Sequence, residues 1–313
     1  MEILWVLLGV LAGICLLCLL TAFICYRMAF YSAPRKPQTG DTIDIPEGDI
    51  YEVFREDMER WCSEIRKMPH EDVEITSFDG LTLRGKFYEC TPGAPMEVMF
   101  HGYRGSGERD LNGGVQRCFR LGRSALIVEQ RASGPSDGKT ITFGVNEHKD
   151  CLAWAEFAQK RYGRKMILTG ISMGASTVLM AAGKELPENV VGILADCGYS
   201  DQQAIIRKVI RDMKLPDGIA YPFVKLGARL FGGFKLDGYT PIDAVKTAKV
   251  PIIFFHGQDD AFVPCQMSRE LYDACAAPKK LVEIPEAGHG LSYLVDPETY
   301  INELRAFFPD VSN

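Results

Sequence analysis

Runs of basic residues are missing from this chain of 313 amino acids, which holds 35 Lys and Arg against 41 Asp and Glu. No five consecutive positions are Lys or Arg, and the formal net charge is −6. Proteins that bind nucleic acid usually carry a basic patch that neutralises phosphates. The sequence therefore gives no indication of a nucleic-acid partner.

Paired cysteines are also missing beyond the N-terminal apolar segment. An odd number at scattered spacing, with no C-x-x-C motif, is typical of buried free thiols. A disulfide framework or a zinc site would need regular pairs. Seven of the ten cysteines lie in this part of the chain: Cys62, Cys90, Cys118, Cys151, Cys197, Cys265 and Cys275.

Charge is absent from the 23 positions between Ile3 and Cys25. A helix of this length is long enough to cross a hydrocarbon core of about 30 Å. A cleaved signal peptide is the alternative, but it needs a basic n-region and a shorter apolar stretch, whereas only Glu2 precedes this run. We therefore expect an uncleaved, single-pass membrane anchor over residues 1–33.

The residues after this span bear on its orientation and on domain boundaries. Arg27, Arg35 and Lys36 follow the span, so the positive-inside bias favours a cytoplasmic C-terminal domain. The stretch 34–50 is rich in Pro, Gly and charge and is expected to be a linker. The catalytic domain is expected over 51–313.

Short apolar runs alternate with helical stretches through this domain. Such a pattern indicates a mostly parallel α/β sheet that helices cover on both faces. A strand–turn–strand with alternating apolar and polar residues around Asp79-Gly80 comes first, at Val73–Phe78 and Leu81–Tyr88. Apolar strands are then expected at Glu97–His101, Ala125–Glu129, Met166–Gly170, Val190–Asp196, Pro251–His256 and Lys280–Ile284. Helices are expected at Tyr51–Met68, Arg109–Leu121, Val145–Tyr162, Met173–Glu185, Ser268–Ala276 and Pro297–Phe308.

The stretch 199–249 interrupts this alternation, because it is much longer than a single connecting helix. Insertions of this length usually carry function or have a structure of their own. We interpret it as a mostly helical cap over the site. A pair of elaborated surface helices is the alternative.

The segment Gly170-Ile-Ser172-Met-Gly174 stands between an apolar strand and a helix rich in small residues. A serine hydroxyl is a poor nucleophile, so a sharp turn must present it to a base. Glycines leave room for neighbouring chain at such a turn. The five-residue pattern also recurs by chance in glycine-rich turns, but the strand and helix around it favour Ser172 as a nucleophile.

A carboxylate and a histidine follow at the ends of two later apolar strands. Either Asp259 or Asp260 could orient the histidine, and the spacing from Gly257 in a G-x-x-D-x-x-V-P pattern favours Asp260. His289 is the candidate base among only five histidines. With Ser172, these residues stand at the C-terminal ends of predicted parallel strands, where open α/β sheets bind ligands.

The loop after the strand at Glu97–His101 is rich in glycine. Acyl transfer needs two backbone N–H donors aimed at the developing oxyanion. We expect one at Met173, directly after the nucleophile, and the other at Tyr103 in this loop. A phosphate-binding loop is the alternative, but no Gly-Lys-Ser/Thr follows and no G-x-G-x-x-G opens a helix.

Five ordered motifs resemble the α/β-hydrolase superfamily: HGYRGSGERD, EQRASGPSDGKTITFG, GISMGAS, HGQDDAFVP and AGHG. The chain is most similar to bacterial hydrolases of the prolyl-oligopeptidase-like and esterase/lysophospholipase-like branch, over Glu71–Phe308. The resemblance implies an eight-stranded sheet with strand two antiparallel, a triad of Ser172, Asp260 and His289, and oxyanion donors at Tyr103 and Met173. Many relatives have R-G-x-G-x-S where this chain has Arg131–Ser136, in a loop that is structural in the family.

Three hypotheses follow for the function. The first is hydrolysis of a carboxylic ester or related acyl bond through an acyl-enzyme, without metal or organic cofactor. The second is a serine peptidase, and the third is a non-catalytic membrane-bound binding protein on a hydrolase scaffold. The apolar insertion and the anchor suit a small-molecule or lipid-like ester, and the oligomeric state is left open.

Overall fold

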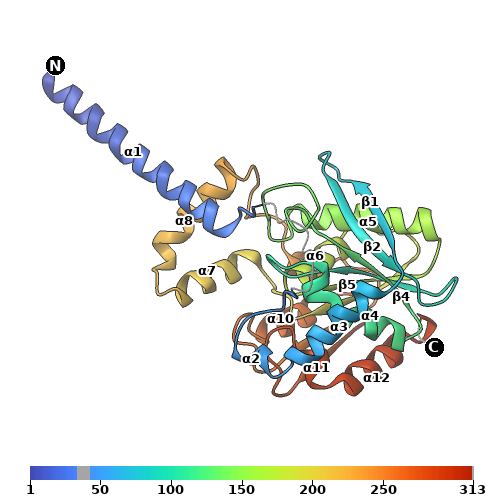
Figure 1. The fold of residues 1–313 in the computed structure, drawn as a ribbon. Coiled ribbons are helices and arrows are strands. Elements are labelled where there is room, and N and C mark those ends of the chain that lie inside the picture. The colour runs from blue at the N-terminus through green and yellow to red at the C-terminus, as the bar shows by residue number, and fades with distance from the viewer. Residues whose placement is uncertain (34–42, 312–313) are drawn as a thin grey trace.

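The computed structural model describes residues 1–33 and 43–311. Its strands form one sheet in the order β1-β2-β4-β3-β5-β6-β7-β8 (Figure 1). The bounds are β1 Glu71–Thr76, β2 Thr82–Tyr88, β3 Met96–Phe100, β4 Ser124–Val128, β5 Met166–Ile171, β6 Val190–Asp196, β7 Ile252–Gly257 and β8 Lys279–Ile284. β2 is antiparallel to β1 and β4, and all other neighbours are parallel. The expected fold class is confirmed.

Helices cover both faces of this sheet. α5, α6 and α10 pack on one face, and α3, α4 and α12 pack on the other. The helices are α1 Glu2–Ala29, α2 Asp49–Glu52, α3 Arg55–Lys67, α4 Gly107–Arg120, α5 Glu147–Tyr162, α6 Met173–Ala182, α7 Gln202–Asp212, α8 Asp217–Leu230, α9 Pro241–Val245, α10 Gln266–Ala274, α11 Ser292–Val295 and α12 Pro297–Phe307, with a final 3₁₀ turn at Pro309–Val311.

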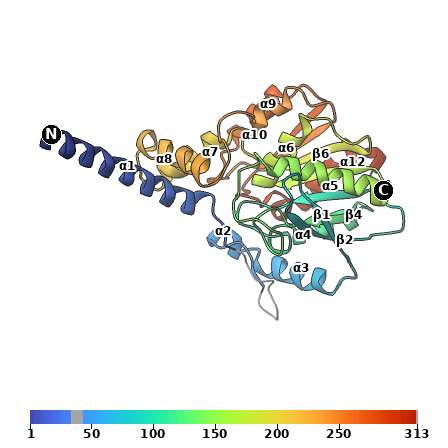
Figure 2. The same cartoon turned by 90° about the horizontal axis from the view of Figure 1, so that it is seen from above.

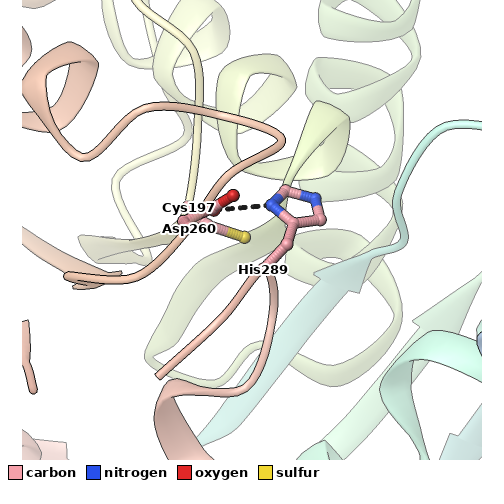
Figure 3. Close-up of side chains that lie close together, drawn as sticks. All are labelled: Cys197, Asp260 and His289. Carbon is pink, nitrogen blue, oxygen red and sulfur yellow. Dashed lines mark hydrogen bonds and ion pairs between the residues drawn. The ribbon is translucent and has the colours of Figure 1, made fainter. Parts of the chain in front are cut away.

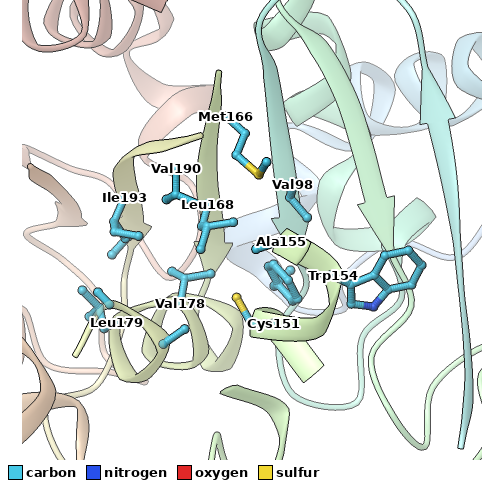
Figure 4. Packing of buried hydrophobic residues seen from close by; sticks show 14 of the residues in the cluster. Val98, Cys151, Trp154, Ala155, Met166, Leu168, Val178, Leu179, Val190 and Ile193 are labelled. Carbon is cyan, nitrogen blue, oxygen red and sulfur yellow. The ribbon is translucent and has the colours of Figure 1, made fainter. Parts of the chain in front are cut away.

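The two apolar faces arise from the alternation of side chains along each strand. Val98 and Phe100 of β3 belong to the cluster under α5 and α6, whereas Met99 between them belongs to the cluster under α3 and α4. Trp154 of α5 is fully buried in the first cluster (Figure 4). Strands buried on both sides explain why their sequences are continuous apolar runs.

The N-terminal helix α1 is docked on the domain only at its C-terminal end. Most of α1 projects away from the body of the protein, and its last turns lie beside α8 (Figures 1 and 2). A Cβ atom at Gly227 of α8 would lie 2.4 Å from the Ala22 carbonyl oxygen, so the two backbones touch. Ala22 and Tyr26 are buried in this contact.

The chain after α1 returns to the domain surface. The linker prediction for 34–50 lies partly outside the described residues, since the structure describes this stretch from Ile43 onward. Ile45 is buried in a cluster with Met58 and Leu291. The helix expected at Tyr51–Met68 is two helices, α2 and α3, and Phe54 at their junction packs against the same cluster.

A buried ionic cluster joins β3 to α4 and β5. The fully buried Glu97 carboxylate accepts hydrogen bonds from Arg117, from Arg123 Nη1 at 2.7 Å and from Thr169 Oγ1 at 2.7 Å. Burial alone would raise the pKa of Glu97, but the two guanidinium groups outweigh it and lower the pKa. Each buried charge in the cluster depends on the others for its solvation.

We predict that Glu97→Ala lowers the free energy of unfolding by about 3–5 kcal/mol, because it leaves buried cations without their carboxylate. Urea denaturation in detergent measures the change. Glu52→Ala removes an exposed partner of Arg55 and serves as the control, with an unchanged midpoint. Equal midpoints for the two variants would contradict the structural role of Glu97.

Candidate active site

Ser172 occupies a sharp turn between β5 and α6. Its φ of 55° and ψ of −119° are rare for a residue with a side chain. A Cβ atom at Gly170 would lie 2.1 Å from the Gly174 carbonyl oxygen, and one at Gly174 would lie 2.0 Å from the Phe100 carbonyl oxygen. Both neighbours are backbone atoms that cannot move aside. Only glycine therefore fits on either side of this serine.

The structure brings Ser172, His289 and Asp260 together. Ser172 Oγ lies 2.9 Å from His289 Nε2, and His289 Nδ1 lies 2.7 Å from Asp260 Oδ2. Asp259 is exposed, whereas Asp260 is 6% exposed. Asp260 is thus the carboxylate that contacts the histidine.

Four groups surround the Asp260 carboxylate, and His289 is one of them. Its Oδ1 accepts the backbone N–H groups of Phe262 and Val263 at 2.9 and 2.8 Å. Its Oδ2 lies 3.2 Å from His256 Nε2 as well as near His289. Burial alone would raise the pKa of Asp260, but the hydrogen bonds from His256 and His289 outweigh it and hold the pKa below its usual value. An ionised Asp260 can only accept, so the proton of His289 is assigned to Nδ1, leaving Nε2 free to accept from Ser172.

Cys197 also lies next to this pair, at the end of β6 (Figure 3). Ligand atoms of Cys197, Asp260 and His289 lie within 4.8 Å of one another. Burial raises the pKa of the Cys197 thiol well above its usual value, and metal binding requires the thiolate. The hydrogen bond to Asp260 already uses His289 Nδ1. These donors fit a hydrogen-bonded pair beside a protonated thiol better than a metal site.

The two expected oxyanion donors come from two separate segments of the chain. Met173 opens α6, and Tyr103 belongs to the loop 101–106 between β3 and α4, here called the oxyanion loop. Within residues 1–33 and 43–311, neither backbone N–H makes a hydrogen bond to another protein group. Both N–H groups therefore lack a protein acceptor among the described residues.

Asp110 holds the oxyanion loop against the start of α4. Its Oδ2 accepts the backbone N–H of Gly102 at 2.9 Å. A Cβ atom at Gly105 would lie 1.8 Å from the same oxygen, so this close approach also requires glycine. On the other side, the ring of His101 is buried, and its Nδ1 lies 2.8 Å from the Gly102 carbonyl oxygen.

The C-terminal end of α1 contacts the same loop. The Tyr103 hydroxyl donates to the Ala29 carbonyl oxygen at 2.8 Å. The Arg104 guanidinium donates to the carbonyl oxygens of Met28 at 2.8 Å and Tyr31 at 3.1 Å. Burial raises the pKa of the Tyr103 hydroxyl, which keeps it a donor. The loop is thus fixed by α4 on one side and by α1 on the other.

A cavity of about 690 Å³ opens over Ser172 and His289. Much of its wall is apolar, including Ile50, Met58, Trp61, Leu111, Phe262 and Leu294. Among the described residues that line it, none belongs to the insertion 199–249. The insertion instead packs its helix α8 against α1.

Three residues of the site are missed by the sequence patterns. The Tyr51 hydroxyl donates to the His289 carbonyl oxygen at 3.0 Å, His256 supports Asp260, and Asp110 supports the oxyanion loop. No local motif marks Tyr51, which lies 238 positions from its partner. Asp110 and His256 do stand within the quoted motifs, but their spacing alone does not specify what they contact.

Comparison with known proteins identifies the family of this chain. Residues 140–313, more than half of the chain, match the sequence profile of the prolyl oligopeptidase family. The chain belongs to the prolyl oligopeptidase family. The serine, aspartate and histidine segments described above all lie within the matched range.

Two curated relatives are similar in sequence to part of this chain. YqkD of Bacillus subtilis is 26% identical over 197 residues, which span 62% of this chain and 64% of YqkD. The lysophosphatidylserine lipase ABHD12 of Danio rerio is 24% identical over 198 residues, which span 60% of this chain and 49% of the lipase.

A solved structure shares the fold of this family member. The Pyrococcus furiosus esterase Pf2001 aligns with a TM-score of 0.65 at 19% identity, covering 90% of this chain and 100% of the esterase. The agreement supports an α/β-hydrolase fold. Together with the family, it identifies an α/β hydrolase of the serine-hydrolase type.

We predict that Gly174→Ala lowers the free energy of unfolding by about 1–3 kcal/mol, because its methyl group would overlap the Phe100 carbonyl oxygen. Gly218→Ala is the matched control, since no atom lies within 4 Å of a Cβ atom there. Urea denaturation of both variants measures the difference. A Gly174→Ala protein as stable as wild type would show that the turn at Ser172 is not as tight as described.

Proposed function

We propose that this protein hydrolyses a carboxylic ester or related acyl bond through a covalent acyl-enzyme on Ser172. The observation that carries the proposal is the chain of hydrogen bonds from Ser172 Oγ through His289 to Asp260. Ser172 Oγ attacks the carbonyl carbon while His289 Nε2 takes its proton. The same nitrogen then returns the proton to the leaving group, and water releases the acid.

Asp260 and the oxyanion donors have separate roles in this proposal. Ionised Asp260 holds His289 in the tautomer with its proton on Nδ1 and stabilises the imidazolium that forms. The backbone N–H groups of Tyr103 and Met173 would bind the oxyanion of the tetrahedral intermediate. Loss of one such donor typically raises the barrier by about 3–4 kcal/mol. The proposed chemistry needs no metal or organic cofactor.

The apolar wall of the cavity supports an acyl group or another hydrophobic group as the ligand. The name of the Danio rerio relative, a lysophosphatidylserine lipase, favours an ester over a peptide. The family name supports a serine peptidase as the second candidate. Both share the steps at Ser172 and differ in the leaving group, which is an alcohol in one and an amine in the other.

We also propose that α1 is an uncleaved membrane anchor and that 51–313 is the catalytic domain with its insertion at 199–249. α1 is long and apolar enough to cross a membrane. A signal sequence passes the same test, but α8 packs on Ala22 and Tyr26 of α1, and cleavage after the apolar run would remove Ala22 from this contact. The Ile141 N–H donates to the Phe30 carbonyl oxygen at 2.8 Å, which further supports a helix end retained by the domain.

The catalytic assignment predicts that Asp260→Asn lowers kcat by about 10⁴-fold, because the amide stabilises the wrong tautomer of His289. Asp259→Asn is the neighbouring control and should retain wild-type turnover. Hydrolysis of short-chain p-nitrophenyl esters and of aminoacyl-naphthylamides measures the effect and separates the two candidate substrates. Turnover that survives Ser172→Ala would exclude the acyl-enzyme proposal.

The anchor assignment predicts that an epitope tag placed before Met1 remains on the mature protein in the membrane fraction. We expect this because α1 packs on α8 and is part of the folded protein. Immunoblotting for the N-terminal tag and a C-terminal tag checks this directly. A mature product that carries only the C-terminal tag would identify α1 as a signal sequence.

A further inference from the structure

The helical hairpin formed by α7 and α8 exposes large apolar side chains. They gather at the turn between the helices and along α8, and their exposed fractions run from 39% to 67%: Met213, Leu215, Ile219, Leu230 and Phe231. The opposite side of the hairpin is buried through Ile206, Ile210, Tyr221 and Val224. The hairpin is therefore amphipathic, with its outer side chains not covered by the described chain.

This apolar surface continues directly onto α1. The rings of Phe231 and Phe23 lie 5.1 Å apart in an edge-to-face contact, and Gly227 touches the backbone at Ala22. Ala22 and Phe23 belong to the uncharged run that is long enough to cross a bilayer. When α1 spans a membrane, the C-terminal end of α8 must lie at the edge of the hydrocarbon region.

The hairpin also carries basic charge that the rest of the chain lacks. Residues 207–237 hold seven Lys and Arg against three Asp, a net charge of +4 in a chain of net charge −6. Lys225 pairs with Asp237, and Arg207 and Arg211 share Asp217. Lys208 pairs with Asp212. Within the described residues, no carboxylate forms an ion pair with the three remaining cations, which are exposed: Lys214, Arg229 and Lys235.

We propose that the α7–α8 hairpin is a second membrane contact, which lies in the headgroup region and binds anionic phospholipid. An amphipathic helix with exposed cations binds such a surface through apolar burial and attraction to lipid charge. A symmetric contact between the hairpins of two copies is disfavoured, because two surfaces of the same net positive charge repel each other. The proposal depends on α1 as a membrane span and does not depend on the chemistry at Ser172.

The proposed contact would also set the orientation of the site relative to the membrane. The same end of α1 that α8 packs on also holds Tyr103 and Arg104 of the oxyanion loop. A hairpin seated in the headgroups would fix the tilt of the domain on the membrane, which a single spanning helix cannot do. The site would then face the bilayer at one defined angle.

Fluorescence quenching by brominated phospholipid in the full-length protein tests this contact. A tryptophan is added as Ile219→Trp or Leu230→Trp in a Trp5→Phe background, which removes the tryptophan of α1. Trp61 and Trp154 remain in the domain, and their emission is measured on the Trp5→Phe protein and subtracted. Ala306→Trp is the control, because it is an exposed position on α12, on the far side of the domain from α1 (Figures 1 and 2). Vesicles consist of phosphatidylcholine alone or mixed with phosphatidylglycerol.

We expect loss of emission at positions 219 and 230 and none at position 306, with larger loss when phosphatidylglycerol is present. The triple variant Lys214→Gln/Arg229→Gln/Lys235→Gln should remove the dependence on phosphatidylglycerol while α1 keeps the protein in the membrane. Quenching at 219 and 230 no greater than at 306 would overturn the proposal. Emission at positions 219 and 230 that changes with protein concentration, and not with brominated lipid, would assign the surface to a second copy and would also overturn the proposal.

Discussion

The contact between Gly174 and the Phe100 carbonyl oxygen is the constraint on which the site depends. It brings the end of β5 against the end of β3, so the serine turn and the oxyanion loop meet at one edge of the sheet. The rare backbone angles of Ser172 persist because this contact leaves the chain no alternative path. Once that turn is fixed, β7 and β8 place Asp260 and His289 at the same edge, as parallel strands must.

Features encoded locally are the ones that the sequence predicts well. All eight strands lie close to where the sequence predicts them. β1 and β2 follow alternating apolar and polar residues around a turn, and β3–β8 follow short apolar runs, which are typical of strands covered on both faces. Ser172, Asp260 and His289 follow from glycine spacing and strand ends, and the structure places their side chains within hydrogen-bond distance. The roles of Tyr103 and Met173 remain predictions, supported by N–H groups that the described chain does not use.

Features that depend on distant contacts are not predictable in this way. Tyr51 reaches the His289 carbonyl oxygen across most of the chain, and no periodicity marks it. The insertion at 199–249 is helical as expected, yet it packs on α1 rather than lining the cavity at Ser172. Its apolar residues could pack on the core or on α1, and the sequence alone does not distinguish these two partners.

If α1 spans a membrane as proposed, its C-terminal end connects membrane attachment to the site more tightly than a flexible tether would. Tyr103 contributes its side chain to α1 and, in our proposal, its backbone N–H to the oxyanion. A hydrolase built in this way would hold its cavity close to the lipid surface, where an ester with an apolar acyl group is concentrated. In this proposal, the oxyanion loop therefore contributes both to the reaction and, through its contact with α1, to the position of the site at the membrane.

The most direct measurement of the central claim is peptide mass mapping after reaction with a fluorophosphonate. The account predicts a single phosphonyl adduct on the Oγ of Ser172, formed in wild type and lost in His289→Ala, because Nε2 of His289 must accept the proton of the serine. A folded protein whose Ser172 stays unmodified, or whose adduct lies on another residue, would contradict the assignment of Ser172 as the nucleophile.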